Sequence, residues 1–172
     1  MKRLRTRVSD LDRRRRHRST ARAILRLLPE PESWLDVGTG DARFPQAAKE
    51  LFPYTSFDGV DATARVEEAR EADRVEEAYV GSLTDERIAT GLRARYDVVT
   101  LLRPPDPADE LRAALAVLRP GGYLLLEGVD APAEELRAEL ESQGCTILPP
   151  RNRRPRPWTT YRLIAHKEPS AP

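Results

Sequence analysis

Apolar residues in this chain fall in short blocks, and most blocks are followed by a stretch with helical spacing. Five blocks stand out, at 34–38, 56–61, 78–82, 96–102 and 123–128. Each is a short apolar run bounded by Gly, Pro, Asp or Ser, which is typical of buried strands. The block YDVVTLL at 96–102 gives the strongest strand prediction. The pattern therefore predicts five strands separated by helical segments.

Helical spacing between the blocks is clearest after the first one. Phe44, Ala47, Ala48 and Leu51 recur at i, i+3, i+4 and i+7, which indicates one buried helical stripe. Further helices are predicted at 64–73, near 84–94, around 111–118, and from Pro132 to a stop at Gly144. Alternating strands and helices predict a doubly wound, mostly parallel α/β sheet with helices on both faces, because parallel neighbours need crossover connections.

The end of the chain breaks this alternation. RPGG at 119–122 is predicted to turn the chain into the fifth strand, and two more strands follow at 145–148 and 159–166. The basic, proline-rich segment between these last two has no helical pattern. The final strand is therefore predicted to be antiparallel to its neighbour, which gives a seven-stranded sheet. Residues 168–172 are predicted to be a disordered tail.

The N-terminal region is basic rather than apolar. Residues 1–18 lack apolar periodicity and are predicted to be a frayed or partly helical basic arm. Ser19 or Thr20 is predicted to cap a short helix that runs through Leu28. Residues 19–167 then form a single domain, since 172 residues suffice for one sizeable core but not for two ordinary ones.

Composition and charge exclude several classes of protein. The net charge is +1, although residues 1–28 hold eleven Lys or Arg against two Asp. The lone Cys145 excludes an internal disulfide, and two histidines give no metal site. No block approaches the roughly 20 apolar residues that cross a bilayer, and no signal-peptide pattern is present. We therefore expect a cytoplasmic protein with no membrane partner.

The first predicted strand ends in an acidic, glycine-containing turn. Asp36, Gly38, Gly40 and Ala42 follow one another at two-residue spacing in DVGTGDA. A dinucleotide site needs a third glycine where Arg43 stands, so that class of site is disfavoured. A tight turn without any ligand is the alternative. The spacing D-x-G-x-G-x-A resembles motif I of the class I S-adenosylmethionine (SAM) dependent methyltransferases.

Other residues extend this resemblance over about residues 20–166. Asp61 ends the second strand, LRPGG at 118–122 precedes the fifth, and the last strand is antiparallel, as in that family. LDVGTGDARFP with FDGVD is most similar to actinobacterial members. The resemblance implies a Rossmann-like sheet in the order 3-2-1-4-5-7-6. It also implies SAM as the cofactor and S-adenosylhomocysteine as its product.

The resemblance further implies which residues contact SAM. Beside the methionine part lie Asp36, Gly38, Thr39 and Gly40, and on the ribose lies Asp61. Near the adenine lie Ala62, Ser82 and Leu83, and beneath the sulfonium lie Thr100 and Leu101. Asp61 would accept hydrogen bonds from the ribose hydroxyls. Many members carry an aspartate where Ser82 stands, so backbone amides would share in adenine recognition. Without a ligand, Asp61 is interpreted as a helix cap, Ser82 as the start of a turn and Thr100 as core.

The loop after the fourth strand, LLRPPDP at 101–107, departs from one branch of the family. Amine-directed members have Asn or Asp, then Pro-Pro, then an aromatic residue at this place. Arg103 and Asp106 stand at the two outer positions instead, so that chemistry is not carried over. Asp106 is a candidate general base, with a solvated loop carboxylate as the alternative.

Three functions follow from these residues. The first is methyl transfer to a small-molecule acceptor in specialised metabolism. The second is RNA methylation, because the basic arm and RNRRPRPW at 151–158 would flank one cleft and favour an anionic acceptor. An Arg-rich solvated surface is the alternative there. The third is an inactive scaffold or regulatory protein. Without a lid insertion, the arm, a second subunit in a homodimer or a macromolecular acceptor would shield the reaction.

Overall fold

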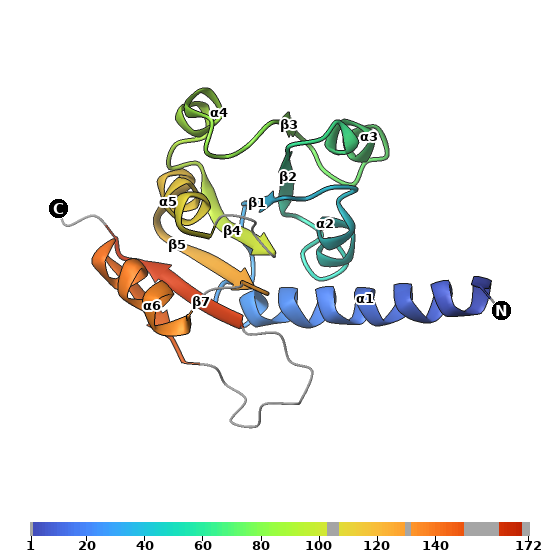
Figure 1. The fold of residues 1–172 in the computed structure, drawn as a ribbon, viewed down its shortest axis with the longest axis horizontal. Coiled ribbons are helices and arrows are strands. Elements are labelled where there is room, and N and C mark those ends of the chain that lie inside the picture. Colours follow the sequence, from blue (N-terminus) through green and yellow to red (C-terminus); the bar gives the residue numbers. More distant parts are fainter. Residues whose placement is uncertain (1, 103–106, 130–131, 150–161, 170–172) are drawn as a thin grey trace.

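The computed structural model describes residues 2–102, 107–129, 132–149 and 162–169, and within them seven strands form one sheet (Figure 1). The strands are β1 (Ser33–Val37), β2 (Ser56–Asp61), β3 (Ala78–Val80), β4 (Tyr96–Leu102), β5 (Leu118–Glu127), β6 (Cys145–Leu148) and β7 (Arg162–Lys167). Their order is β3-β2-β1-β4-β5-β7-β6. Strands β1 to β5 pair in parallel, and β7 is antiparallel to both β5 and β6. The predicted fold class, strand order and antiparallel last strand are confirmed.

Helices cover both faces of this sheet. They are α1 (Lys2–Leu25), α2 (Arg43–Ala48), α3 (Arg65–Glu71), α4 (Glu86–Gly91), α5 (Pro107–Val117) and α6 (Ala133–Ser142). Helices α1, α2 and α3 lie on one face, and α4, α5 and α6 lie on the other (Figure 1). Parallel strands need this double cover, since both of their faces are apolar.

The core has one hydrophobic cluster on each face. Beneath α1 and α2, the fully buried Trp34 packs against Phe44, Phe52 and Phe57, with ring centroids 5.2–5.7 Å apart. The opposite cluster joins strands β1, β4 and β5 to helices α5 and α6 through leucine and valine side chains. These two clusters hold the sheet between its helices. Because β1 to β5 are parallel, their carboxyl ends lie at one edge of the sheet.

The predicted helix start at Ser19 or Thr20 is wrong, because α1 is one continuous helix from Lys2 to Leu25. Ser19 and Thr20 lie inside it instead of capping a shorter helix. Ion pairs with α2 and its neighbourhood support the helix where apolar periodicity is missing. Arg14 and Arg18 both pair with Glu50, and Arg43 pairs with Asp10 at 3.1 Å. Among the described residues, no helix is long and apolar enough to cross a membrane.

The predicted RPGG turn is also wrong as a boundary, because β5 already begins at Leu118. The pairing with β4 shifts there: Tyr96 faces Leu118, whereas Val98 faces Tyr123. Gly121 takes up part of this irregularity with a φ of 81°. A strand can contain an irregular stretch with extra residues and still continue beyond it. Local sequence does not distinguish such a stretch from a turn that ends the strand.

Candidate functional site

The glycine turn after β1 is held open by backbone hydrogen bonds. The N–H groups of Gly38 and Thr39 donate to the carbonyl of Val60, at 2.9 and 3.2 Å, which ties the turn to β2. Gly38 and Gly40 have φ angles of 69° and 54°, in the region that favours glycine. A Cβ placed on Gly38 would meet no heavy atom within 4 Å. The space above this backbone is therefore open.

Asp36 lies beneath the turn and is buried. Its carboxylate accepts hydrogen bonds from the hydroxyl groups of Thr39, at 2.7 Å, and Thr100, at 2.6 Å. Burial raises the pKa of Asp36 from 3.8 to about 6, and the two hydroxyl donors only partly oppose this. Asp36 and Thr100 also face each other across β1 and β4. This carboxyl group thus fixes the shape of the turn from within.

Asp61 joins the turn to the end of β2. Its Oδ2 accepts the N–H of Gly40 at 2.8 Å, and its Oδ1 accepts the N–H and hydroxyl of Thr63 at 2.9 and 2.6 Å. Helix α3 starts later, with Ala64 at the N-cap and no side-chain cap, so Asp61 does not cap it. A carboxylate oxygen can accept two hydrogen bonds, so Oδ2 keeps capacity for a hydroxyl donor.

The remaining predicted site residues differ in exposure. Ala62 and Ser82 are exposed, and the Ser82 hydroxyl already lies 2.7 Å from the Thr84 hydroxyl. Leu83 and Leu101 are buried in the apolar core. Asp106, Arg103 and the segment 151–158 lie outside the described residues.

A cavity of about 430 Å³ adjoins the glycine turn and extends over the ends of β4 and β5. It is lined by Arg13, Arg16, His17, Thr20, Asp36, Gly38, Thr39, Asp41, Arg43, Phe44, Leu102 and Glu127. Helix α1 supplies one wall, α2 a second, and the strand ends the floor. Sequence reasoning missed Glu127, although a charged residue closing the apolar run YLLLE is a signal that could have found it.

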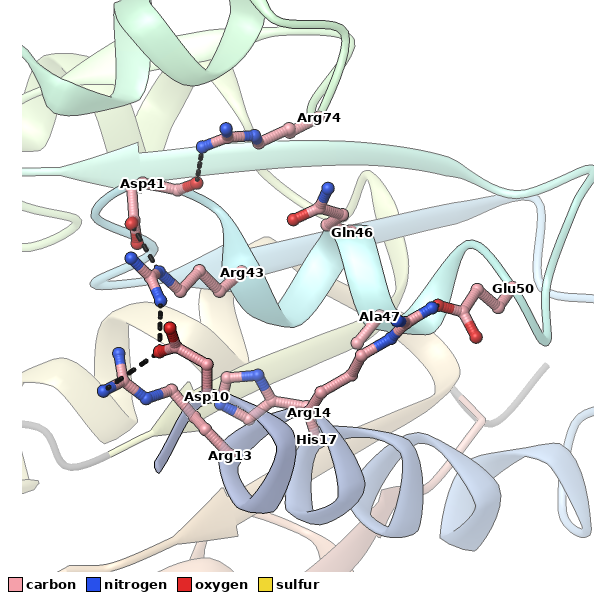
Figure 2. A pocket seen from close by; sticks show the side chains of 10 residues that line it. All are labelled: Asp10, Arg13, Arg14, His17, Asp41, Arg43, Gln46, Ala47, Glu50 and Arg74. Carbon is pink, nitrogen blue, oxygen red and sulfur yellow. Dashed lines mark hydrogen bonds and ion pairs between the residues drawn. The ribbon is translucent and has the colours of Figure 1, made fainter. Parts of the chain in front are cut away.

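A second cavity of about 360 Å³ opens between α1 and α2 (Figure 2). It shares Arg13, His17, Asp41 and Arg43 with the first. His17 contacts the ring of Phe44 edge-on at 5.8 Å, and burial lowers the pKa of its imidazole. The side chain is therefore neutral at pH 7. The Arg43 guanidinium binds Asp41 at 2.6 Å as well as Asp10.

Helix α1 is anchored to the sheet by a small polar network. The Thr20 hydroxyl donates to Oε2 of Glu127 at 2.7 Å, and Arg162 donates to the same oxygen at 2.9 Å. Arg162 also donates to the Thr20 hydroxyl at 2.8 Å. The three residues come from α1, β5 and β7, so this network holds the helix above the carboxyl ends of the strands.

These residues fit a nucleoside cofactor with an amino-acid tail. The absence of a side chain at Gly38 leaves open space above the backbone. The N–H of Gly40 donates to Asp61, so the glycine turn and the end of β2 are adjacent. Asp61 offers acceptor capacity for a ribose diol, and the turn offers close approach to backbone. Dinucleotide binding would need a third glycine where the side chain of Arg43 stands.

Comparison with known proteins identifies the family. Residues 12–167 match the model of a methyltransferase domain family. No curated protein matches the chain in sequence. The chain therefore belongs to the methyltransferase domain family, and its fold is that of the class I SAM-dependent methyltransferases. SAM is the cofactor of this class.

Solved structures share the fold at low sequence identity. An O-methyltransferase family protein from Burkholderia thailandensis is 16% identical, with a TM-score of 0.62, over 82% of this chain and 52% of that one. The 1,6-didemethyltoxoflavin-N1-methyltransferase of the same organism, with bound S-adenosylhomocysteine, is 21% identical with a TM-score of 0.66, over 88% and 78%. A putative methyltransferase of Haloferax volcanii, in complex with its Trm112 activator, is 19% identical with a TM-score of 0.65, over 94% of both. The chain spans only about half of the first of these proteins.

Proposed function

We propose that this protein transfers a methyl group from SAM to a small-molecule acceptor. The observation that carries the proposal is the cavity beside the glycine turn, walled by α1 and α2 and floored by the strand ends. Its volume of about 430 Å³, which the methionine part of SAM would share beside Gly38 and Thr39, lies within the range of small-molecule sites, roughly 300–1,000 Å³. Its wall from α1 supplies the shield that a compact domain without an insertion needs.

The donor side of the site is assigned to the turn and its neighbours. Gly38, Thr39 and Gly40 would lie beside the methionine part, with the shape of the turn set by Asp36. Asp61 would accept the ribose hydroxyls, and Ala62 with the backbone near Ser82 would border the adenine. SAM supplies an electrophilic methyl group on a sulfonium. The residues of this chain would position the acceptor in line with it and exclude water.

RNA as the acceptor keeps one supporting observation. Arg15 and Arg22 are exposed on α1 and Arg26 in the turn after it, and none of the three has an acidic partner within the described structure. Arg13 and Arg14, by contrast, face Asp10 and Glu50. Binding of total RNA at physiological salt, lost when Arg13 to Arg16 are neutralised, would favour RNA over a small molecule.

Labelled SAM separates these functions. Protein is incubated with methyl-labelled SAM and, in parallel, with a low-molecular-weight metabolite extract or with total RNA. Label in the small-molecule fraction supports the proposal, and label in RNA alone overturns it. Calorimetry with SAM and S-adenosylhomocysteine tests the third function. Well-folded protein that gives no heat with either ligand would be a scaffold. A homodimer stays a prediction, which light scattering checks.

A further inference from the structure

The side chains on one face of the sheet change character toward the cavity. Beneath α1, Trp34 of β1 faces Val98 of β4, and both are buried in the apolar cluster. Two residues further along, Asp36 faces Thr100, and after that Leu102 faces Glu127 across β4 and β5. Residues two apart on a strand share a face. This face of the sheet is therefore apolar beneath α1, and it carries the carboxylates of Asp36 and Glu127 where it forms the floor of the cavity.

The arginines around this cavity do not make it cationic. Its lining holds three arginines, from α1 and α2, and three carboxylates, Asp36, Asp41 and Glu127. Arg43 is bound by two acids, and Arg13 lies 4.0 Å from Asp10. Arg16 is exposed and pairs with no acid among the described residues, but the two paired arginines offer an anionic acceptor little attraction. The charge of such an acceptor would also face the Glu127 carboxylate at the floor.

Hydrogen bonds hold one oxygen of the Glu127 carboxylate, and the other oxygen accepts none from the described residues. Its side chain is 16% exposed, and Oε2 accepts from both Thr20 and Arg162. Oε1 accepts no hydrogen bond from the described residues. A fixed carboxylate oxygen beside a cavity is a strong acceptor for O–H or N–H donors, since hydrogen bonds to a charged group are stronger than those between neutral groups. Phe44 and Leu102 supply apolar surface beside it.

We propose that Glu127 contacts the methyl acceptor and accepts a hydrogen bond from its hydroxyl or amino group. The acceptor class is then neutral or cationic molecules with an O–H or N–H beside an apolar ring or chain, and not phosphates or carboxylates. The inference rests on the proposed function, because it assumes that the cavity over β4 and β5 takes the acceptor. The hydrogen bond orients the acceptor and requires no proton transfer to Glu127.

Fragment binding tests this assignment without a known acceptor. Saturation-transfer NMR is run on protein saturated with S-adenosylhomocysteine, with phenol and benzylamine as donors and benzoate and phenyl phosphate as anions. We expect the donors to bind more tightly than the anions. In Glu127→Gln, the amide oxygen would face Thr20 and Arg162 and its NH₂ would face the cavity. Donor affinity should therefore fall at least tenfold, and benzoate affinity should stay the same or rise.

Two control variants separate contact from anchoring. Glu139→Gln makes the same chemical change on α6, on the opposite face, and should leave all four affinities unchanged. Arg162→Gln breaks the anchor of α1 but keeps the carboxylate. If Glu127 only anchored the helix, Glu127→Gln and Arg162→Gln would weaken all fragments alike and lower the melting temperature together.

Several outcomes overturn the assignment. They are tighter binding of the anions, binding of neither class, or donor affinities that Glu127→Gln leaves unchanged. Calorimetry with S-adenosylhomocysteine on the same samples distinguishes the two levels of failure. If that ligand does not bind, the proposed function fails. If it binds and the fragment pattern is absent, only the role of Glu127 fails.

Discussion

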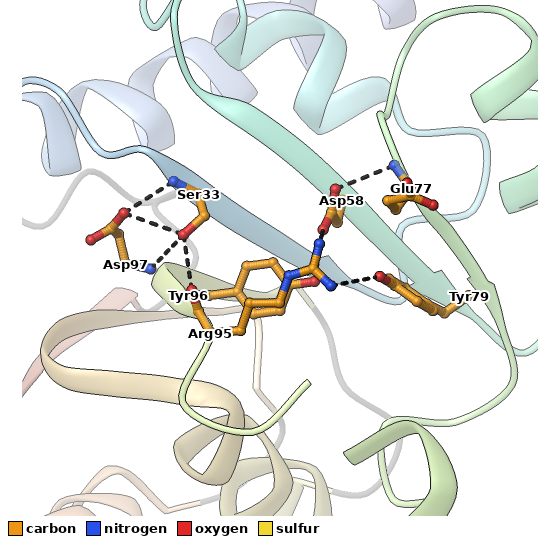
Figure 3. A network of polar contacts seen from close by, with 7 residues as sticks. All are labelled: Ser33, Asp58, Glu77, Tyr79, Arg95, Tyr96 and Asp97. Atoms are coloured by element: carbon orange, nitrogen blue, oxygen red, sulfur yellow. Dashed lines mark hydrogen bonds and ion pairs between the residues drawn. The ribbon is translucent and has the colours of Figure 1, made fainter. Parts of the chain in front are cut away.

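Acidic side chains at the amino ends of the strands differ in their hydrogen bonding from those at the carboxyl ends. At the amino ends, Asp97 is saturated: its Oδ2 accepts from the N–H of Ser33 at 3.0 Å and from the Ser33 hydroxyl at 3.2 Å (Figure 3). The same oxygen accepts from the N–H of Glu32 at 2.9 Å. Its Oδ1 pairs with Arg119. Such a network stabilises the fold and leaves nothing for a ligand.

Asp58 on β2 belongs to the same kind of network (Figure 3). It accepts from the Tyr96 hydroxyl at 2.8 Å, from Arg95 at 3.3 Å and from the N–H of Glu77 at 3.2 Å. Burial raises the pKa of Asp58, and burial together with the Asp58 carboxylate raises the pKa of Tyr96. The tyrosine therefore remains a donor at any physiological pH.

The carboxyl ends hold acids with unused capacity. Oδ2 of Asp61 accepts one hydrogen bond, and Oε1 of Glu127 accepts none from the described residues. Open backbone at Gly38 lies between them in the sheet order. Asp58 and Asp61 each accept three hydrogen bonds from the described residues, so the number of bonds does not by itself distinguish a structural acid from a candidate site acid. The distinction lies in what surrounds the remaining acceptor capacity: Asp61 and Glu127 lie beside the open turn or the cavity, whereas Asp58 and Asp97 lie at the opposite ends of the strands. The predictions below test that distinction.

The largest effect is expected at the saturated end. Asp97→Ala leaves two backbone N–H groups without their acceptor, so the free energy of unfolding should fall by about 3 kcal/mol. Urea unfolding measures this. The affinity for S-adenosylhomocysteine, measured on folded protein, should change less than about threefold, or roughly 0.7 kcal/mol. A strong loss of affinity with little loss of stability would reverse the distinction.

Asp36 should give a pH-dependent effect of up to about 3 kcal/mol. Its pKa is about 6 in the folded protein and 3.8 ordinarily, so the folded state keeps the proton longer than the unfolded state. Ionised Asp36 therefore costs stability above pH 6, and this cost disappears as the pH falls toward 4. Relative to Asp36→Asn, the wild type should gain stability from pH 7 to pH 4 in urea titrations. A constant difference would contradict the buried-acid account.

Asp61→Asn tests the unsaturated acid on the donor side. The neutral amide accepts hydroxyl donors more weakly, so affinity for S-adenosylhomocysteine should fall tenfold to a hundredfold, or about 1.4–2.7 kcal/mol. Stability should change by less than about 1 kcal/mol, because Asp61 is only half-buried. Calorimetry and urea unfolding provide the two numbers. An unchanged affinity would remove Asp61 from the site.

Ser82→Ala should have the smallest effect. The side chain is exposed, and its hydroxyl is already bonded to Thr84, by 2.7 Å to the hydroxyl and 3.2 Å to the N–H. We expect affinity for S-adenosylhomocysteine within about threefold of wild type and stability within about 0.5 kcal/mol. A loss beyond tenfold would show that the Ser82 hydroxyl itself recognises the adenine.

Local pattern predicted much of the fold and the glycine turn beside Asp61. The bounds of β2 and β4 match the predicted blocks 56–61 and 96–102, because a buried parallel strand is an uninterrupted apolar run. The closeness of Gly40 to Asp61 follows from the parallel pairing of β1 and β2, which brings their carboxyl ends together. These features depend on periodicity and turn chemistry, which neighbouring residues encode.

Tertiary structure alone decided the cavity and the helix beside it. The arginines of α1 find acids on and near α2, and Thr20 meets Glu127 across 107 positions of the chain. Charge pairs of this kind have no periodic signature, so the basic arm resembled a frayed segment. By itself the sequence pattern determined the alternation of strands and helices and the glycine turn, and the resemblance to the methyltransferases supplied the strand order. Packing of α1 against α2 and the strand ends determined where an acceptor can lie, because long-range contacts arise only once the sheet has set its neighbours in place.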